Sequence, residues 1–169
     1  MFADARITGS VCRIGRPLSC AALLLVAACS STRFVSPNRA ALDPAAAVIG
    51  QEVVAVTKTL VGAPYRYGGA TPDGFDCSGL VQYAYKKAGL NVPRSTLLQF
   101  RYAQRVKVAQ VRAGDVLFFR VSDRKVTHVG IYTGHGRFIH APSTGSRVSY
   151  ARIDNPFWNK RLVSAGRLY

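Results

Sequence analysis

The chain has 169 residues, enough for one domain with a hydrophobic core but too few for two of ordinary size. Apolar residues make up 49% of the chain, which excludes a disordered protein, and 23 Lys and Arg against 8 Asp and Glu give a net charge of +15. Such a charge attracts polyanions, but the chain has no zinc-finger spacing, RNP-like aromatic motif or helical cluster of Lys and Arg, so we expect no nucleic-acid partner.

Residues 1–28 have the pattern of an export signal. A basic segment precedes an apolar run at residues 18–26, which is too short to span a bilayer, and small residues follow it. The sequence LVAAC at 25–29 resembles a bacterial lipobox, which implies cleavage before Cys29 and lipidation of that residue. Ser30 resembles the sorting signal of lipoproteins sent to the outer membrane, where they face the periplasm. The alternative is an ordinary secretory signal with a chance cysteine.

We therefore predict a signal peptide at 1–28, a lipidated cysteine with a flexible tether at 29–47, and one domain at 48–169. Export also bears on the four cysteines of the chain. Two would leave with the signal and one would carry lipid, so Cys77 has no partner for an intramolecular disulfide. An idle thiol in an oxidising compartment risks oxidation, which disfavours a merely structural Cys77.

Helices are predicted in the first half of the domain. Apolar residues recur at helical spacing over residues 44–60, and again from Cys77 until Gly89 ends the pattern. A short third helix follows, with Ser95 or Thr96 as its N-cap.

The start of the second helix is the candidate reactive site. With Asp76 as N-cap, Cys77 would lie in the first turn, where unpaired N–H groups and the helix dipole lower the pKa of a thiol and can bind an oxyanion. The alternative for Cys77 is a buried structural cysteine. Tyr65 is either an oxyanion donor or a packing aromatic. Arg94 either grips a substrate carboxylate or pairs with an acidic neighbour.

The second half of the domain has the pattern of strands. Short segments with β-type residues are separated by Gly, Asp, Asn, Ser or Pro turns. The six segments are 106–108, 116–119, 128–132, 137–141, 147–151 and 162–169. Helices early and strands late favour an antiparallel α+β domain over alternating βαβ units.

Two histidines fall within these strands. If a three-residue loop at 133–135 or an equivalent bulge joins the strands, His128 and His140 pair directly on one face, with Cβ atoms about 5 Å apart. A two-residue loop at 134–135 would separate them. His135 lies in the turn, and we expect no role for it. A cysteine with two histidines suits nucleophilic acyl transfer. A zinc site would need a fourth ligand or a C-x-x-C spacing, and the sequence shows neither, so we expect no metal or cofactor.

Several motifs together resemble the NlpC-type cell-wall peptidases, which are papain-like cysteine peptidases of bacterial peptidoglycan. The resemblance covers about residues 48–169. Its motifs are YRYGG at 65–69, FDCSGLV at 75–81, PRS at 93–95, AGDV at 113–116, HVGIY at 128–132 and FIHA at 138–141. The lipobox together with NPFWNKR at 155–161 is similar to the outer-membrane murein endopeptidase lipoproteins of Gram-negative bacteria.

The resemblance implies a papain-like fold with N-terminal helices packed on an antiparallel sheet, and it assigns roles by position. Cys77 would be the nucleophile, His128 the base and His140 the residue that orients the base. Tyr65 and the backbone N–H of Cys77 would line the oxyanion hole.

The resemblance further places Asp76 and Ser78 where family members bind the stem peptide, and Arg94 is the third candidate for substrate binding. The expected function is hydrolysis of an amide bond in peptidoglycan stem peptides or cross-links through a thioester. The bond would be either a DD-cross-link or the γ-D-glutamyl-diaminopimelate bond. The alternatives are a non-catalytic wall-binding lipoprotein and an acyltransferase that uses the same thioester.

Overall fold

The computed structural model describes residues 44–122 and 124–169. The predicted signal peptide, Cys29 and most of the tether lie outside these residues. Helix α1 (Pro44–Thr59) begins four residues before the predicted domain boundary, so residues 44–47 are helical and not part of a tether. A proline at the first position and three alanines after it explain this, because both favour a helix start. No helix in the described ranges is long and apolar enough to cross a membrane.

The other predicted helices are present. In α2 (Cys77–Lys87) the Asp76 side chain accepts a hydrogen bond from the N–H of Gly79, which confirms the predicted N-cap. In α3 (Thr96–Tyr102) the cap is Ser95. Two short elements were not predicted: a hairpin of β1 (Ala70–Thr71) and β2 (Gly74–Phe75) just before α2, and the one-turn α4 (Pro156–Asn159).

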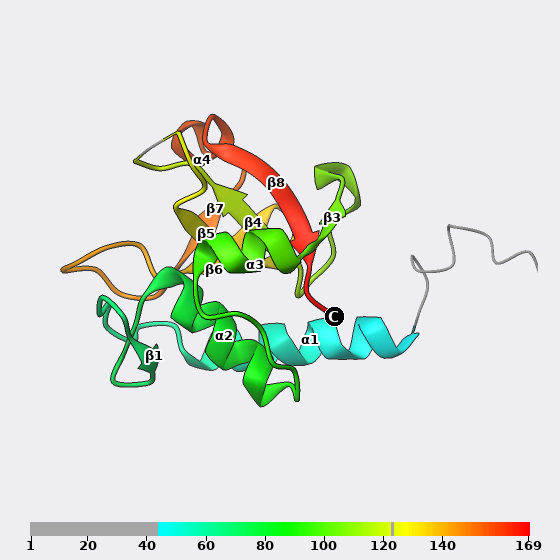
Figure 1. Cartoon of the computed structure of the whole chain (residues 1–169), viewed down its shortest axis with the longest axis horizontal. Coiled ribbons are helices and arrows are strands. Elements are labelled where there is room, and N and C mark those ends of the chain that lie inside the picture. The colour runs from blue at the N-terminus through cyan, green and yellow to red at the C-terminus, as the bar shows by residue number, and fades with distance from the viewer. Residues whose placement is uncertain (1–43, 123) are drawn as a thin grey trace, which may run out of the picture. The chain divides into compact units, whose positions relative to one another are not determined.

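The strands form a six-stranded antiparallel sheet in the order β3-β8-β4-β5-β6-β7, so the predicted α+β class is confirmed (Figure 1). The predicted strand at 106–108 is the least accurate, since β3 ends at Val106 and a 3₁₀ turn, η2 (Val108–Gln110), follows. The strands are β3 (Gln104–Val106), β4 (Val116–Phe119), β5 (His128–Gly134), β6 (Arg137–His140), β7 (Ser149–Arg152) and β8 (Leu162–Arg167).

The two faces of the sheet have different neighbours. One face packs against α1 and α2, and its fully buried side chains include Val116, Phe118, Val129 and Ile131. Side chains alternate along a strand, so the residues between them point to the other face. That face forms a separate apolar cluster of Leu117, Phe119, Phe138 and Ala165, with Trp158 of α4 packed against it.

The turn between β5 and β6 differs from the predicted loop. His135 and Gly136 both have positive φ, 52° and 70°, as in a two-residue hairpin turn, and a bulge precedes them. With Ile131 opposite Ile139, His140 lies opposite position 130 and diagonal to His128. The prediction of a shared face is confirmed, whereas direct pairing is wrong, because the shorter turn and the bulge together shift the register by two.

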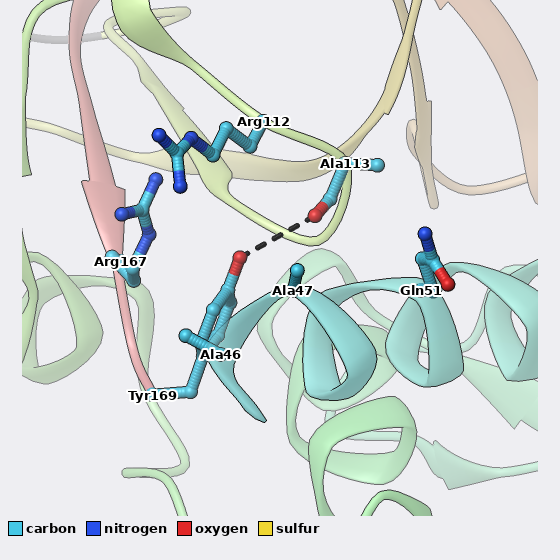
Figure 2. A pocket seen from close by; sticks show the side chains of 7 residues that line it. All are labelled: Ala46, Ala47, Gln51, Arg112, Ala113, Arg167 and Tyr169. Carbon is cyan, nitrogen blue, oxygen red and sulfur yellow. Dashed lines mark hydrogen bonds between the residues drawn. The ribbon is translucent and has the colours of Figure 1, made fainter. Parts of the chain in front are cut away.

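A buried ion pair lies at the end of the sheet opposite to His128. Asp115 is fully buried and forms two 2.8 Å hydrogen bonds with the guanidinium of Arg167. Beside it, a cavity of about 200 Å³ lies next to α1, and Figure 2 shows Tyr169 pointing across it to the Ala113 carbonyl at 3.4 Å. The lining contains no Cys, His or Ser side chain. Its residues are Ala46, Ala47, Gln51, Arg112, Ala113, Arg167 and Tyr169.

Candidate active site

The β1–β2 hairpin leads the chain directly into the first turn of α2, where Cys77 lies half-buried as a free cysteine. The loop closes through a hydrogen bond from the Asp76 N–H to the Gly69 carbonyl, 3.0 Å. Gly79 must lack a side chain, because a Cβ there would lie 2.0 Å from the same carbonyl oxygen. The glycines of the motif therefore allow the loop to press against the start of the helix.

The Cys77 thiol lies 3.5 Å from the Thr96 hydroxyl of α3. Burial raises the pKa of Cys77; the Thr96 hydroxyl opposes this, the Asp76 carboxylate adds to it, and the backbone N–H groups of Val129 and Ser78 oppose it. The predicted lowering of the thiol pKa is therefore wrong. The helix start does offer N–H groups, but desolvation of the thiolate outweighs them.

The Asp76 carboxylate holds the Arg94 side chain in a two-pronged ion pair. Arg94 donates to both carboxylate oxygens at 2.9 and 2.6 Å, and also to the Ser78 hydroxyl at 3.0 Å. Backbone N–H groups of Gly68 and Gly79 donate to the same carboxylate. Burial alone would raise the pKa of Asp76, but the hydrogen bonds from Arg94 and Gly79 lower it below its usual value.

These contacts show that Asp76 and Arg94 have the structural roles that the sequence allowed as alternatives to substrate binding. Asp76 caps α2, and Arg94 pairs with an acidic neighbour. Substrate binding by Asp76, Ser78 and Arg94 stays a prediction. The Arg94 side chain is 37% exposed, so part of it faces solvent beside the start of α2.

Tyr65 lies on the segment before the hairpin and makes a single parallel bridge to Phe75. Burial raises the pKa of its hydroxyl, and so do the charges of Cys77 and Asp76. Tyr65 is therefore a protonated donor within electrostatic range of the thiol. This position suits the predicted oxyanion role, which stays a prediction.

His128 and His140 are joined by a hydrogen bond of 2.9 Å between Nε2 of the first and Nδ1 of the second. Both are buried, at 6% and 3% exposure, and their rings stand nearly perpendicular, at 89°. Burial, together with the charge of His140, lowers the pKa of His128 to about 3, and burial lowers that of His140 to about 4. Both imidazoles are neutral near pH 7.

The Cys77 thiol lies near the start of β5, the strand that begins with His128. The N–H of Val129, next to His128, favours the Cys77 thiolate. Within the described part of the chain, Cys77 makes no hydrogen bond to either imidazole, and its hydroxyl partner is Thr96. Nε2 of His128 is occupied by His140, so Nδ1 is the nitrogen left to take a proton.

Two residues of the site were missed by sequence reasoning. Thr96 was considered only as a helix cap, yet its hydroxyl lies beside the thiol. Trp158 was noted only as part of a motif, yet its indole lies 5.4 Å from the His128 ring and 4.7 Å from the His140 ring. Across residues 44–122 and 124–169, no group of three or more His, Cys, Asp or Glu side chains could hold a metal ion.

Comparison with known proteins gives matches over the same part of the chain. The pattern of the NlpC/P60 family matches residues 62–167. The murein DD-endopeptidase MepH of Escherichia coli K12 is 38% identical over 122 residues, which cover 68% of this chain and 45% of MepH. The gamma-DL-glutamyl hydrolase of Bacillus subtilis 168 is 36% identical over 140 residues, covering 81% of this chain and 33% of the hydrolase.

The fold is also similar to solved structures. A crystal structure of an NlpC/P60 family protein from Bacillus cereus has a TM-score of 0.67 and 30% identity, covering 70% of this chain and 40% of that protein. This chain thus spans less than half the length of either curated relative. The matched region contains Cys77, His128 and His140, and it covers more than half of the sequence. The chain belongs to the NlpC/P60 family.

Proposed function

We propose that this protein is a peptidoglycan endopeptidase that cleaves an amide bond of murein stem peptides or cross-links through a thioester on Cys77. The observation that carries the proposal is the hydrogen-bonded imidazole pair, with His128 at the start of β5 and His140 at the end of β6, together with Cys77 at the N-terminus of α2 near the Val129 N–H. The name of one relative, a murein DD-endopeptidase, supports the same substrate class, and that of another, a gamma-DL-glutamyl hydrolase, supports hydrolysis at a glutamyl bond.

The proposed reaction starts from a neutral thiol and a neutral imidazole. As Sγ of Cys77 attacks the amide carbon, Nδ1 of His128 takes the thiol proton, and the carbonyl electrons move to the oxygen. The backbone N–H of Cys77 and the Tyr65 hydroxyl would stabilise that oxyanion. His140 holds Nε2 of His128, which leaves Nδ1 as the nitrogen that receives the proton.

Collapse of this intermediate breaks the C–N bond, and the departing amine takes the proton from His128. The product is a thioester on Cys77. Water then attacks the thioester while His128 accepts its proton and returns it to the Cys77 sulfur. The second product is a free carboxylic acid. No step needs an external oxidant or cofactor.

The test is incubation of the purified full-length chain with sacculi and isolated muropeptides, followed by mass analysis of the products. Loss of cross-linked dimers in favour of monomers would identify a DD-endopeptidase. Products ending at the γ-D-glutamyl bond would identify a DL-endopeptidase. A Cys77→Ala variant is expected to give neither product. An Asp154→Ala variant, which changes only an exposed ion pair, serves as the matched control.

Two outcomes would favour the other functions. If Cys77→Ala cleaves murein as fast as wild type, a thioester on Cys77 is contradicted. If neither protein cleaves murein, a wall-binding role is favoured. If a Cys77-dependent product carries a peptide transferred to an amine acceptor, the protein is an acyltransferase.

We also propose that the mature protein is anchored by lipid on Cys29 in the bacterial envelope, in the outer membrane facing the periplasm. The support is the lipobox at 25–29 and the serine after it. Labelling with a fatty-acid analogue followed by membrane fractionation tests this. A Cys29→Ala variant is expected to lose the label, and a labelled variant or an unlabelled wild type would contradict the anchor.

A further inference from the structure

Trp158 covers the imidazole pair on the sheet face opposite to α1 and α2. It sits in the one-turn helix α4, whose start is fixed by Pro156 and by a hydrogen bond of 2.9 Å from the Phe157 N–H to the Asn155 side chain. Its indole also packs edge-on against the Phe119 ring, with centroids 5.0 Å apart. The half-buried indole is therefore held between the sheet and solvent.

The indole meets the two imidazoles in different orientations. It stacks on His128 at 27° and stands edge-on to His140 at 82°. Because the planes of the two imidazoles are themselves nearly perpendicular, the rigid indole can lie roughly parallel to His128 and perpendicular to His140 at the same time. Histidine rings rotate easily about their second side-chain torsion, so hydrogen bonding through one atom pair does not by itself fix either ring plane.

Rotation of either ring would disturb two contacts at once, the contact with the indole and the 2.9 Å bond between the imidazoles. We propose that Trp158 is a positioning residue: it fixes both imidazole planes and shields their hydrogen bond from water, so that Nδ1 of His128 faces the thiol proton. This consequence for cleavage rests on the proposed function, whereas the ring geometry does not.

Few other groups beside the imidazole pair could fix the planes of its rings. The remaining rings beside the pair are Phe119, 6.1 Å from His128, and Phe138, 5.2 Å from His140. Among the described residues, neither imidazole has a hydrogen bond or ion pair with an Asp, Glu, Lys or Arg side chain. At the start of α2, the Cys77 thiol is near the backbone N–H of Val129, the residue after His128. Protonation of the pair is thus resisted by burial, to which Trp158 contributes, and by the second imidazole.

The first experiment follows the imidazoles by NMR titration in a Cys77→Ala background, so that it does not depend on cleavage. We expect both rings to stay neutral down to about pH 5 with Trp158 present. In Trp158→Ala, water reaches the rings, and we expect at least one imidazole to protonate about one pH unit or more higher. Trp158→Phe keeps a flat ring and should restore most of the wild-type titration. Tyr102→Ala, which removes an exposed aromatic side chain, is the matched control.

The second experiment measures kcat/KM against pH on muropeptides. Trp158→Ala should lose on the order of 10²-fold, since a misplaced base costs about that much, with the acid limb moved to higher pH. If folded Trp158→Ala leaves the imidazole titration unchanged, the inference is overturned. If the titration shifts but wild type cleaves no murein, the proposed function fails while the positioning role stands.

Discussion

The thiol and the imidazoles of this site are held by different kinds of contact. Cys77 packs against the apolar core, but the contacts that orient it are polar: the Asp76–Arg94 ion pair, backbone N–H groups and the Thr96 hydroxyl. Around His128 and His140 they are aromatic, from Phe119, Phe138 and Trp158. Polar contacts fix the nucleophile through directional bonds to nearby backbone, whereas the imidazoles are fixed by the planes of rings from three separate elements.

Both arrangements nevertheless favour the uncharged form of the reacting group. Burial raises the pKa of the Cys77 thiol and lowers those of His128 and His140. The resting site is therefore a thiol and an imidazole and not a thiolate and an imidazolium. The base must remove the proton as the substrate is attacked, so the position of His128 matters more than the acidity of the thiol.

The largest effect is expected on the aromatic side, from loss of the base. His128→Gln should lower kcat/KM on muropeptides by about 10²- to 10⁴-fold, the usual contribution of a general base. His140→Gln should lower it less, because it removes only the orienting bond. His135→Gln, in the exposed turn of the same hairpin, is the control. Equal activity of His128→Gln and wild type would remove His128 from the reaction.

On the polar side, the expected loss is in stability. Asp76→Ala removes the cap of α2, the bond to the Gly68 N–H and the partner of Arg94. We expect the free energy of unfolding to fall by about 2–3 kcal/mol, less than for a fully buried pair because Arg94 is partly exposed. Urea unfolding measures it.

Asp154→Ala provides the comparison for that change. Asp154 forms a similar pair with Arg152, but both side chains are exposed, at 64% and 59%. We expect no measurable change in stability from it. If the two substitutions destabilise equally, the network around Asp76 contributes nothing beyond a surface ion pair.

The polar side of the site was largely predictable from sequence, because its contacts are local. The Asp76 cap lies one residue from the nucleophile, and Arg94 follows within the next motif. The aromatic side was not, since Trp158 contacts residues more than 17 positions away on strands whose register the sequence left open. The thiol pKa was predicted with the wrong sign because helix position is visible in a sequence and burial is not.

The fold shows the same division. The cap and bounds of α2 and the start of α3 follow from short-range signals and were predicted, and so was β4. The turn after β5 depends on His135 and Gly136 both adopting positive φ together with a bulge, which no single residue signals. Local rules thus gave the elements, whereas long-range pairing decided their register.

The pH dependence of stability should come mainly from the aromatic side. His128 and His140 have folded pKa values of about 3 and about 4, below the unfolded value near 6.5, so their contribution is complete above about pH 6.5. It is lost as the pH falls from there toward the folded values, by up to about 1.4 kcal/mol per pH unit for each histidine. Asp76, whose folded pKa is lowered, loses its contribution only below about pH 4.

Urea unfolding of wild type and His128→Gln at about pH 7 and about pH 5 measures this slope. The variant keeps one of the two histidines, so its loss of stability between the two pH values should be smaller. An equal loss in both proteins would show that groups outside the imidazole pair control acid sensitivity.

The smallest effect is expected at Thr96, where the polar side reaches the sulfur. Its hydroxyl opposes the rise in the Cys77 pKa, so Thr96→Val should raise that pKa further. Alkylation of Cys77 at fixed pH, followed by peptide mass analysis, should then slow by about 3- to 10-fold. Valine has nearly the shape of threonine, and Thr96→Ser, which keeps the hydroxyl, should react within about twofold of wild type. Because the neutral thiol attacks the amide while His128 takes its proton, cleavage should fall less than alkylation. An equal fall in both rates would mean that a preformed thiolate carries the reaction.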